Sequence, residues 1–241
     1  MESAETLIAG AQAAADVGAV KYCMETSGRR PSEQVLGAVC KAATRIASDL
    51  KIRLCVSIGT LTDAQARRLK AAGVTRYNNH NHESSRCYFP QICTTHTWEE
   101  RVATVRRART AGLEACCGGM SGLGETLADR VDLALALRDL EIEAIPVNLF
   151  NPRVGTPLAN QAVLGAVEAL KALAMFRLVN PRAELRAAGG REVILRTLQP
   201  LALFAVNSIF TQGYLTTAGQ GPSRDLELLA QAGFEMGIIE G

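Results

Sequence analysis

Short apolar runs alternate along the chain with longer segments whose hydrophobic residues recur at helical spacing. The apolar runs are typical of buried parallel strands. They begin near Val20, Ile52, Val74, Leu113, Ala144, Leu185 and Ser208. The helical segments cover about residues 3–17, 32–49, 63–72, 98–111, 126–139, 159–179, 193–204 and 223–233. Strict alternation of the two kinds of segment predicts a parallel α/β fold.

Local sequence signals support the predicted helix ends. Thr62-x-x-Gln65 and Thr97-x-x-Glu100 both have the form of a capping box at a helix start. Gly73 follows an Ala-rich helix end, where a left-handed C-cap residue is expected.

The alternation is compatible with an open doubly wound sheet and with a (β/α)8 barrel of the TIM type. The number of strands favours the barrel, with its first strand missing, because the chain opens on a helix. We find no linker or low-complexity segment, so residues 1–241 are predicted to form a single domain. In such a barrel, functional residues gather at the carboxyl ends of the strands.

Composition narrows the class of protein. A net charge of +2 without long runs of one sign gives no indication of nucleic-acid or membrane-surface binding. No stretch of about 18 residues is apolar and uncharged, and the start does not resemble a secretory signal. Seven cysteines, an odd number, argue against a disulfide framework. A reducing cytoplasm is the expected compartment.

Four residues stand at or near the ends of predicted strands and could share one centre. They are Cys23, Cys55, Cys116 and Arg186, in the runs VKYC, IRLC, LEAC and AELR. Three thiolates that converge inside a barrel predict a metal or iron–sulfur site.

Polar residues follow the third strand in the segment RYNNHNHESS. At a period of two, Asn79, Asn81 and Glu83 share one face and could bind ribose hydroxyls or a urea-like group. His80 and His82 point the other way, where packing or hydrogen-bonding roles are favoured over a metal site. The alternative for the whole segment is a polar loop.

Three further segments could contact a ligand. CCGGMSGLGE is a glycine-rich strand–helix junction, which either lets a nucleotide approach the backbone or serves as a structural turn. Asn148 is an amide inside an apolar strand, so it needs a neighbour or a ligand as its partner. Thr216 and Thr217 could bind a carboxylate or act in a turn.

Taken together, these segments resemble the biotin synthases, a family of radical S-adenosylmethionine (SAM) enzymes. The likeness rests on YNNHNHESSRCYFPQICTTHTWEERV, EACCGGMSGLGETLADR, PVNLFNPRVGTPL, LRAAGGREVILR and YLTTAG, and it runs from about Ala4 to Phe234. It implies a (β/α)8 barrel, usually as a homodimer, with a 2Fe–2S and a 4Fe–4S cluster. The resemblance implies that Cys23, Cys55, Cys116 and Arg186 hold the 2Fe–2S cluster.

The resemblance also implies binding roles for individual residues. For SAM it implies Asn81 and Glu83 at the ribose, Arg101 at the methionyl part, and the loop containing Gly118, Met120 and Gly122 near the adenine. For dethiobiotin it implies Asn81 and Asn148 at the ureido ring, and Asn79, Thr216 and Thr217 at the carboxylate.

The implied reaction inserts sulfur into dethiobiotin. The 4Fe–4S cluster cleaves SAM to a radical that abstracts hydrogen, and the 2Fe–2S cluster supplies the sulfur. The resemblance also implies a reducing partner such as flavodoxin or ferredoxin.

One departure from the family pattern is large. The family holds its 4Fe–4S cluster with C-x3-C-x2-C after the first strand, and this spacing is absent from the 241 residues. We therefore expect an N-terminally truncated chain that is inactive alone. The alternatives are another radical SAM enzyme, such as a maturase or a methylornithine synthase relative, and a degenerate, non-catalytic barrel that binds an iron–sulfur cluster or SAM.

Overall fold

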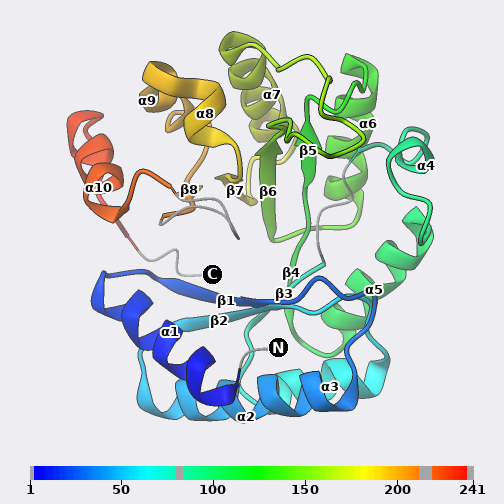
Figure 1. The fold of residues 1–241 in the computed structure, drawn as a ribbon, viewed down its shortest axis with the longest axis vertical. Coiled ribbons are helices and arrows are strands. Elements are labelled where there is room, and N and C mark those ends of the chain that lie inside the picture. Colours follow the sequence, from blue (N-terminus) through cyan, green and yellow to red (C-terminus); the bar gives the residue numbers. More distant parts are fainter. Residues whose placement is uncertain (1–2, 80–83, 212–218, 238–241) are drawn as a thin grey trace. The chain divides into compact units, whose positions relative to one another are not determined.

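The computed structural model describes residues 3–79, 84–211 and 219–237. The described chain forms two compact units, the first from residues 3–79 and 96–116 and the second from 84–95, 117–211 and 219–237. In both units parallel strands alternate with helices (Figure 1). The prediction of one domain over residues 1–241 stays a prediction.

The first unit contains four parallel strands in the order β1-β2-β3-β4. Its elements are α1 (Ala4–Asp16), β1 (Lys21–Glu25), α2 (Glu33–Asp49), β2 (Arg53–Ser57), α3 (Asp63–Ala71), β3 (Arg76–Asn78), α5 (Trp98–Thr110) and β4 (Glu114–Cys116). Both predicted capping boxes are present, at the starts of α3 and α5. Gly73 has the predicted left-handed conformation, with φ +92°.

The core of the first unit lies between one face of its strands and its helices. Met24, Val56 and Tyr77 come from the strands, and Leu36 and Leu69 from α2 and α3. Helices α1, α2 and α3 lie along the same side of β1 and β2 (Figure 1). The side chains on the opposite face of these strands are therefore not part of this core.

The second unit is also built on parallel strands, with β5 next to β6, β6 next to β7, and β7 next to β8. Its elements are α4 (Phe89–Ile92), β5 (Gly119–Ser121), α6 (Leu127–Asp139), β6 (Ala144–Leu149), α7 (Ala166–Val179), β7 (Glu184–Ala187), α8 (Arg191–Leu195), the 3-10 helix η1 (Arg196–Leu198), α9 (Gln199–Ala202), β8 (Ser208–Ile209) and α10 (Pro222–Gln231).

The second unit differs from the sequence prediction at several places, of which the short helix α4 is one. The helix predicted over 159–179 begins only at Ala166. The helix predicted over 193–204 is divided into α8, η1 and α9, because Arg196 has a non-helical φ of +50°. Strand β5 occupies part of the glycine-rich segment, for which the sequence predicted either a nucleotide-approach loop or a structural turn.

A buried ion pair joins α10 to α8. Arg191 Nη2 lies 2.8 Å from Asp225 Oδ1, and the two side chains are 3% and 1% exposed. Gln220 donates a second hydrogen bond to the same carboxylate oxygen at 2.6 Å. These contacts fix the last helix to the body of its unit.

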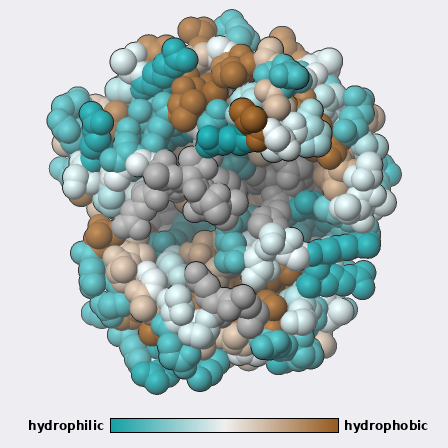
Figure 2. Space-filling model, viewed as in Figure 1, coloured by the Kyte–Doolittle hydropathy of each residue, from teal (hydrophilic) through white to brown (hydrophobic). Residues whose placement is uncertain are grey.

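Within the described residues, no helix is long and apolar enough to cross a membrane. Hydrophobic residues are mixed with hydrophilic ones over the face drawn in Figure 2.

Candidate functional site

Three thiols lie on one face of the strands in the first unit. Cys23 of β1 and Cys55 of β2 are direct partners in parallel register, and Cys116 of β4 is the partner of Asn78 on β3. Alternate residues such as Val56 belong to the hydrophobic core on the other face. Strand alternation thus puts Cys23, Cys55 and Cys116 on the same face, which we call the thiol face.

The thiols of this face influence one another. Cys55 and Cys116 are buried, and Cys23 is half-buried and donates a hydrogen bond to Glu25 Oε1 at 3.4 Å. A hydrogen bond with Cys55 and burial raise the pKa of Cys23 well above its ordinary value of 9.0, and the charges of Cys55, Glu25 and Cys116 act in the same direction. Without a bound metal, the thiol is therefore protonated at neutral pH.

A cluster of charges continues the row of Cys23 and Cys55 at one end of the thiol face. Arg76, buried and in register with Cys55, holds Glu114 through Nε at 2.8 Å and Nη2 at 2.7 Å. Arg53 also pairs with Glu114. Burial works to raise the pKa of Glu114, but Arg76 and Arg53 outweigh it, and the pKa lies below its usual value. One carboxylate thus faces two guanidinium groups, which leaves this end of the face positively charged.

Sequence reasoning missed three polar residues on the thiol face. Glu25 and Ser57 are partners in register, and Asn78 of β3 donates to Glu25 Oε1 at 3.3 Å. Among the described residues, Glu25 Oε2, Ser57 Oγ and Asn78 Oδ1 are buried without a hydrogen-bond partner. The signal was available in the sequence, because Glu25 and Ser57 each follow a thiol of their own strand by two residues.

The described residues contain no group of three or more His, Cys, Asp or Glu side chains placed to hold a metal ion. None of the seven cysteines, all of which lie in the described residues, forms a disulfide.

Asn79 and Arg101 bind each other in the first unit. The Asn79 amide donates to the Arg101 carbonyl at 2.8 Å, and Arg101 Nη1 donates to the Asn79 carbonyl at 3.0 Å. Arg101 Nε also donates to His96 at 2.7 Å. Burial lowers the pKa of His96, and the charge of Arg101 lowers it further. The neutral imidazole can therefore accept the hydrogen bond that Arg101 donates, and this network fixes the end of β3 to α5.

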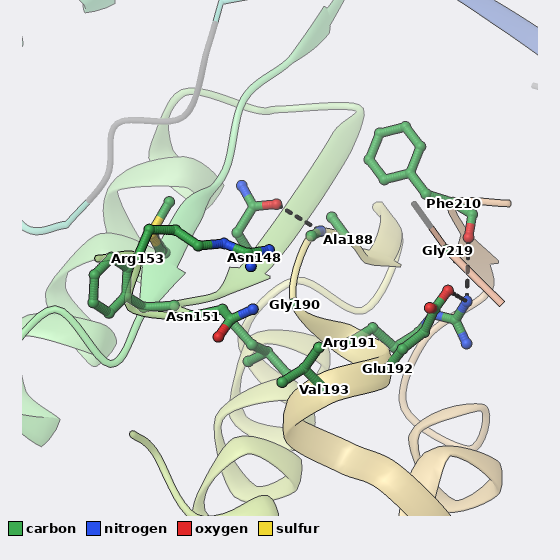
Figure 3. Close-up of a pocket in the computed structure, with 14 residues that line it drawn as sticks. Asn148, Asn151, Arg153, Ala188, Gly190, Arg191, Glu192, Val193, Phe210 and Gly219 are labelled. Atoms are coloured by element: carbon green, nitrogen blue, oxygen red, sulfur yellow. Dashed lines mark hydrogen bonds and ion pairs between the residues drawn. The ribbon is translucent and has the colours of Figure 1, made fainter. Parts of the chain in front are cut away.

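A cavity of about 230 Å³ lies in the second unit, beside β5 and β6 (Figure 3). Met120 and Asn148 are direct partners in register and both line it. Asn148 Oδ1 accepts a hydrogen bond from the Gly189 backbone at 2.8 Å. The amide group is therefore oriented by the protein, and its carbonyl side is already used.

Backbone packing explains the first glycine of the predicted SAM loop. A Cβ at Gly118 would lie 1.8 Å from the carbonyl oxygen of Pro146, so no other residue fits there without a shift. Gly122 has a φ of +102°, which also favours glycine.

The rest of this loop is organised by an internal carboxylate. Buried Glu125 accepts hydrogen bonds from the Gly122 and Leu123 backbones at 2.8 and 2.7 Å. Arg130 pairs with the same carboxylate at 2.6 Å. These two backbone N–H groups are thus occupied within the loop.

Arg186 lies in the second unit, on β7. Its Nε donates to Ser208 Oγ at 2.9 Å, and the guanidinium pairs with Glu184. The guanidinium also lies 4.8 Å from the centre of the Phe210 ring. The side chain is therefore held by a carboxylate, a hydroxyl and an aromatic ring.

Several predicted site residues lie outside the described residues. They are His80, Asn81, His82, Glu83, Thr216 and Thr217. Their predicted roles stay predictions, as do the ligand roles of the other residues.

Comparison with protein families gives two matches that together span most of the chain. The Radical SAM superfamily model matches residues 1–137. The Biotin and Thiamin Synthesis associated domain matches residues 146–235.

Solved structures show the same fold at low sequence identity. The crystal structure of HydG, a maturase of the [FeFe]-hydrogenase, has a TM-score of 0.79 at 15% identity and covers 97% of this chain and 56% of its own. Methylornithine synthase (PylB) has a TM-score of 0.69 at 15% identity and covers 99% and 91%. The predicted α/β class, of the barrel type found in radical SAM proteins, is confirmed.

Relatives in sequence are biotin synthases. The biotin synthase of Salinibacter ruber is 53% identical over 240 residues, which are 100% of this chain and 67% of the relative. That of Rhodopirellula baltica is 47% identical over 232 residues, 96% of this chain and 64% of the relative. The chain thus spans about two thirds of the length of these relatives. At these identities and over this length, the chain belongs to the biotin synthase family of radical SAM enzymes.

Proposed function

We propose that this chain carries the sulfur-donating half of biotin synthase, the enzyme that converts dethiobiotin to biotin. Cys23, Cys55 and Cys116 hold a 2Fe–2S cluster in this proposal. The observation that carries it is the presence of these three thiols on one buried face. Arg186 as the fourth ligand stays a prediction from the sequence.

The chemistry of the thiol face supports an iron–sulfur cluster. Membership of the radical SAM superfamily implies SAM and iron–sulfur clusters as cofactors. The three thiols share one face, and Cys55 and Cys116 both act on the pKa of Cys23; cysteine thiolates are the usual ligands of iron–sulfur clusters. Arg76 and Arg53 supply positive charge beside a site that becomes anionic when thiolates form.

The bound cofactors would supply a SAM-derived radical and a sulfur atom for insertion into C–H bonds. The chain's own residues position the reactants and exclude water. Cys55 and Cys116 are buried, so these two thiols are shielded from solvent. The thiols must release their protons when they bind metal, so cluster binding depends on pH.

We assign dethiobiotin to the cavity beside Asn148. A ureido group offers N–H donors and a carbonyl acceptor. The Asn148 carbonyl is bound to Gly189, so its N–H groups remain to donate to the ureido oxygen. Met120 provides an apolar wall beside it.

The remaining assignments rest on family membership. They are SAM binding by Asn81, Glu83, Arg101 and the Gly118–Gly122 loop, substrate carboxylate binding by Asn79, Thr216 and Thr217, a homodimer, and a flavodoxin or ferredoxin as reductant. The 241 residues contain no C-x3-C-x2-C segment. Accordingly, in our proposal they hold the sulfur-donating cluster but do not form biotin by themselves.

Anaerobic reconstitution of the chain with iron and sulfide tests this proposal. We expect about two iron atoms per chain and the visible spectrum of a 2Fe–2S cluster, without biotin formation from dethiobiotin, SAM and a reductant. The Cys23→Ala, Cys55→Ala and Cys116→Ala variants should each lose the spectrum. Cys40→Ala and Cys87→Ala, which change cysteines outside the thiol face, should keep it.

Absence of iron from the reconstituted wild-type chain would contradict the ligand assignment. Biotin formation by the isolated chain would contradict the division of roles. A cluster that survives in all three thiol-face variants would place the ligands elsewhere.

A further inference from the structure

Ser57 is the residue of the thiol face whose environment is least explained by the fold. It is completely buried, and its hydroxyl oxygen has no hydrogen-bond partner among the described residues. A buried hydroxyl without a partner destabilises the folded chain, because its lost hydrogen bonds to water are not replaced. Such a group points to a ligand or to another role that the protein alone does not reveal.

Strand geometry places Ser57 beside the thiols. It follows Cys55 by two residues on β2, so both side chains are on the same face. Its partner in register on β1 is Glu25, which follows Cys23 by two residues. The register of β2 with β3 puts Ser57 level with Asn78, whose partner on β4 is Cys116. Ser57 thus lies one row beyond the Cys23–Cys55 pair, in the row that contains Cys116.

The neighbours of Ser57 are bound to each other and not to its hydroxyl. Glu25 Oε1 accepts from Asn78 at 3.3 Å and from Cys23 at 3.4 Å. These bonds link the strands on either side of Ser57 and leave its O–H without an acceptor. The proton of the hydroxyl is therefore available to an acceptor placed at the thiols.

We propose that the Ser57 hydroxyl donates a hydrogen bond to a sulfur atom of the cluster held by Cys23, Cys55 and Cys116. This inference rests on the proposed function. A hydrogen bond to sulfur stabilises the reduced cluster, which carries more negative charge, and raises its reduction potential. Ser57 is in this sense a tuning residue, which acts on the cluster without ligating it.

The test is a redox titration of reconstituted wild-type protein and of Ser57→Ala, followed by visible absorption. We expect the same iron content in both, and a reduction potential lowered in the variant by about the equivalent of a tenfold change in the reduction equilibrium, 59 mV for one electron. A merely structural role of Ser57 would not move the potential.

A second pair of variants distinguishes loss of the hydroxyl from misfolding of Ser57→Ala. Ser57→Thr and Ser57→Val have nearly the same shape, but only the first keeps a hydroxyl. The potential of Ser57→Thr should stay near that of the wild type, and that of Ser57→Val should fall. Val56→Ala, a change on the opposite face of the same strand, should lower stability and leave the potential unchanged.

The outcomes separate the two proposals. Equal potentials for the wild type, Ser57→Ala and Ser57→Val, all with full iron content, would overturn the role of Ser57 and leave the proposed function intact. A wild-type chain that takes up no iron would overturn both.

Discussion

At the scale of single residues, Cys23 is in contact with both kinds of group on the thiol face, because it pairs in register with Cys55 and donates a hydrogen bond to Glu25. Its position as a ligand candidate could be predicted, because a cysteine at a strand end is visible in the sequence. Its environment could not. Glu25 and Ser57 are two residues beyond thiols of their own strands, but only strand register shows that they are neighbours. Asn79 was expected to face a ligand, which stays a prediction, and the sequence did not show that its amide donates a hydrogen bond to the Arg101 carbonyl of α5.

The raised pKa of Cys23 makes the stability of the cluster-free chain depend on pH. The folded chain keeps the thiol proton at a pH where the unfolded chain has lost it, so unfolding releases a proton. This contribution is complete below the ordinary pKa of 9.0 and is lost as the pH rises through the raised value. We expect the free energy of unfolding, measured by urea titration, to decline above about pH 9.

The Cys23→Ala variant is the control, because it removes the hydrogen-bonded thiol at the centre of this effect. Its stability should decline less steeply over the same pH range. An equal slope in both proteins would show that the dependence has another origin.

At the scale of elements, the sequence predicted the helices with capping signals and most strands. Capping boxes are local, so Thr62 and Thr97 could be read directly. Strand β5 was missed because a glycine-rich segment has a low strand propensity, and pairing with β6 decides its conformation. The interruption at Arg196 was missed because nothing local in its sequence requires a positive φ.

The close contact of Gly118 with β6 gives a prediction at this scale. Gly118→Ala places a methyl group against the Pro146 carbonyl, since the Cβ position is only 1.8 Å from that oxygen. We expect the free energy of unfolding to fall by at least about 2 kcal/mol, as measured by urea denaturation.

Gly37→Ala is the matched control. Gly37 lies inside α2 with no atom within 4 Å of its Cβ position, so this variant should gain up to about 1 kcal/mol. Similar stabilities for the two variants would mean that β5 and β6 are packed less closely.

At the scale of the whole molecule, contacts between residues far apart in the sequence decide features that local patterns do not show. The alternation of apolar and amphipathic segments was sufficient for the parallel α/β class. It could not show that Arg191 and Asp225, which are 34 residues apart, form one buried pair. Both look like ordinary charged residues in the sequence, and only tertiary structure reveals that neither is exposed.

Loss of one partner of this pair should destabilise the second unit strongly. Asp225→Ala leaves the Arg191 guanidinium buried without its counter-charge, so we expect the free energy of unfolding to fall by about 3–5 kcal/mol. The double variant Arg191→Met/Asp225→Ala should lose less than the sum of the two single changes. Glu227→Ala, at an exposed position of the same helix, should change stability by less than about 0.5 kcal/mol. Additive effects of the two single changes would show that the pair is not coupled.

The same buried pair constrains how this sequence can drift. A mutation that removes either charge leaves the other charge buried without a counter-charge. Both single mutants on the way to a neutral pair are therefore less stable than the present chain. Descendants of this chain should therefore keep both charges, or exchange them together for two apolar side chains of matching size.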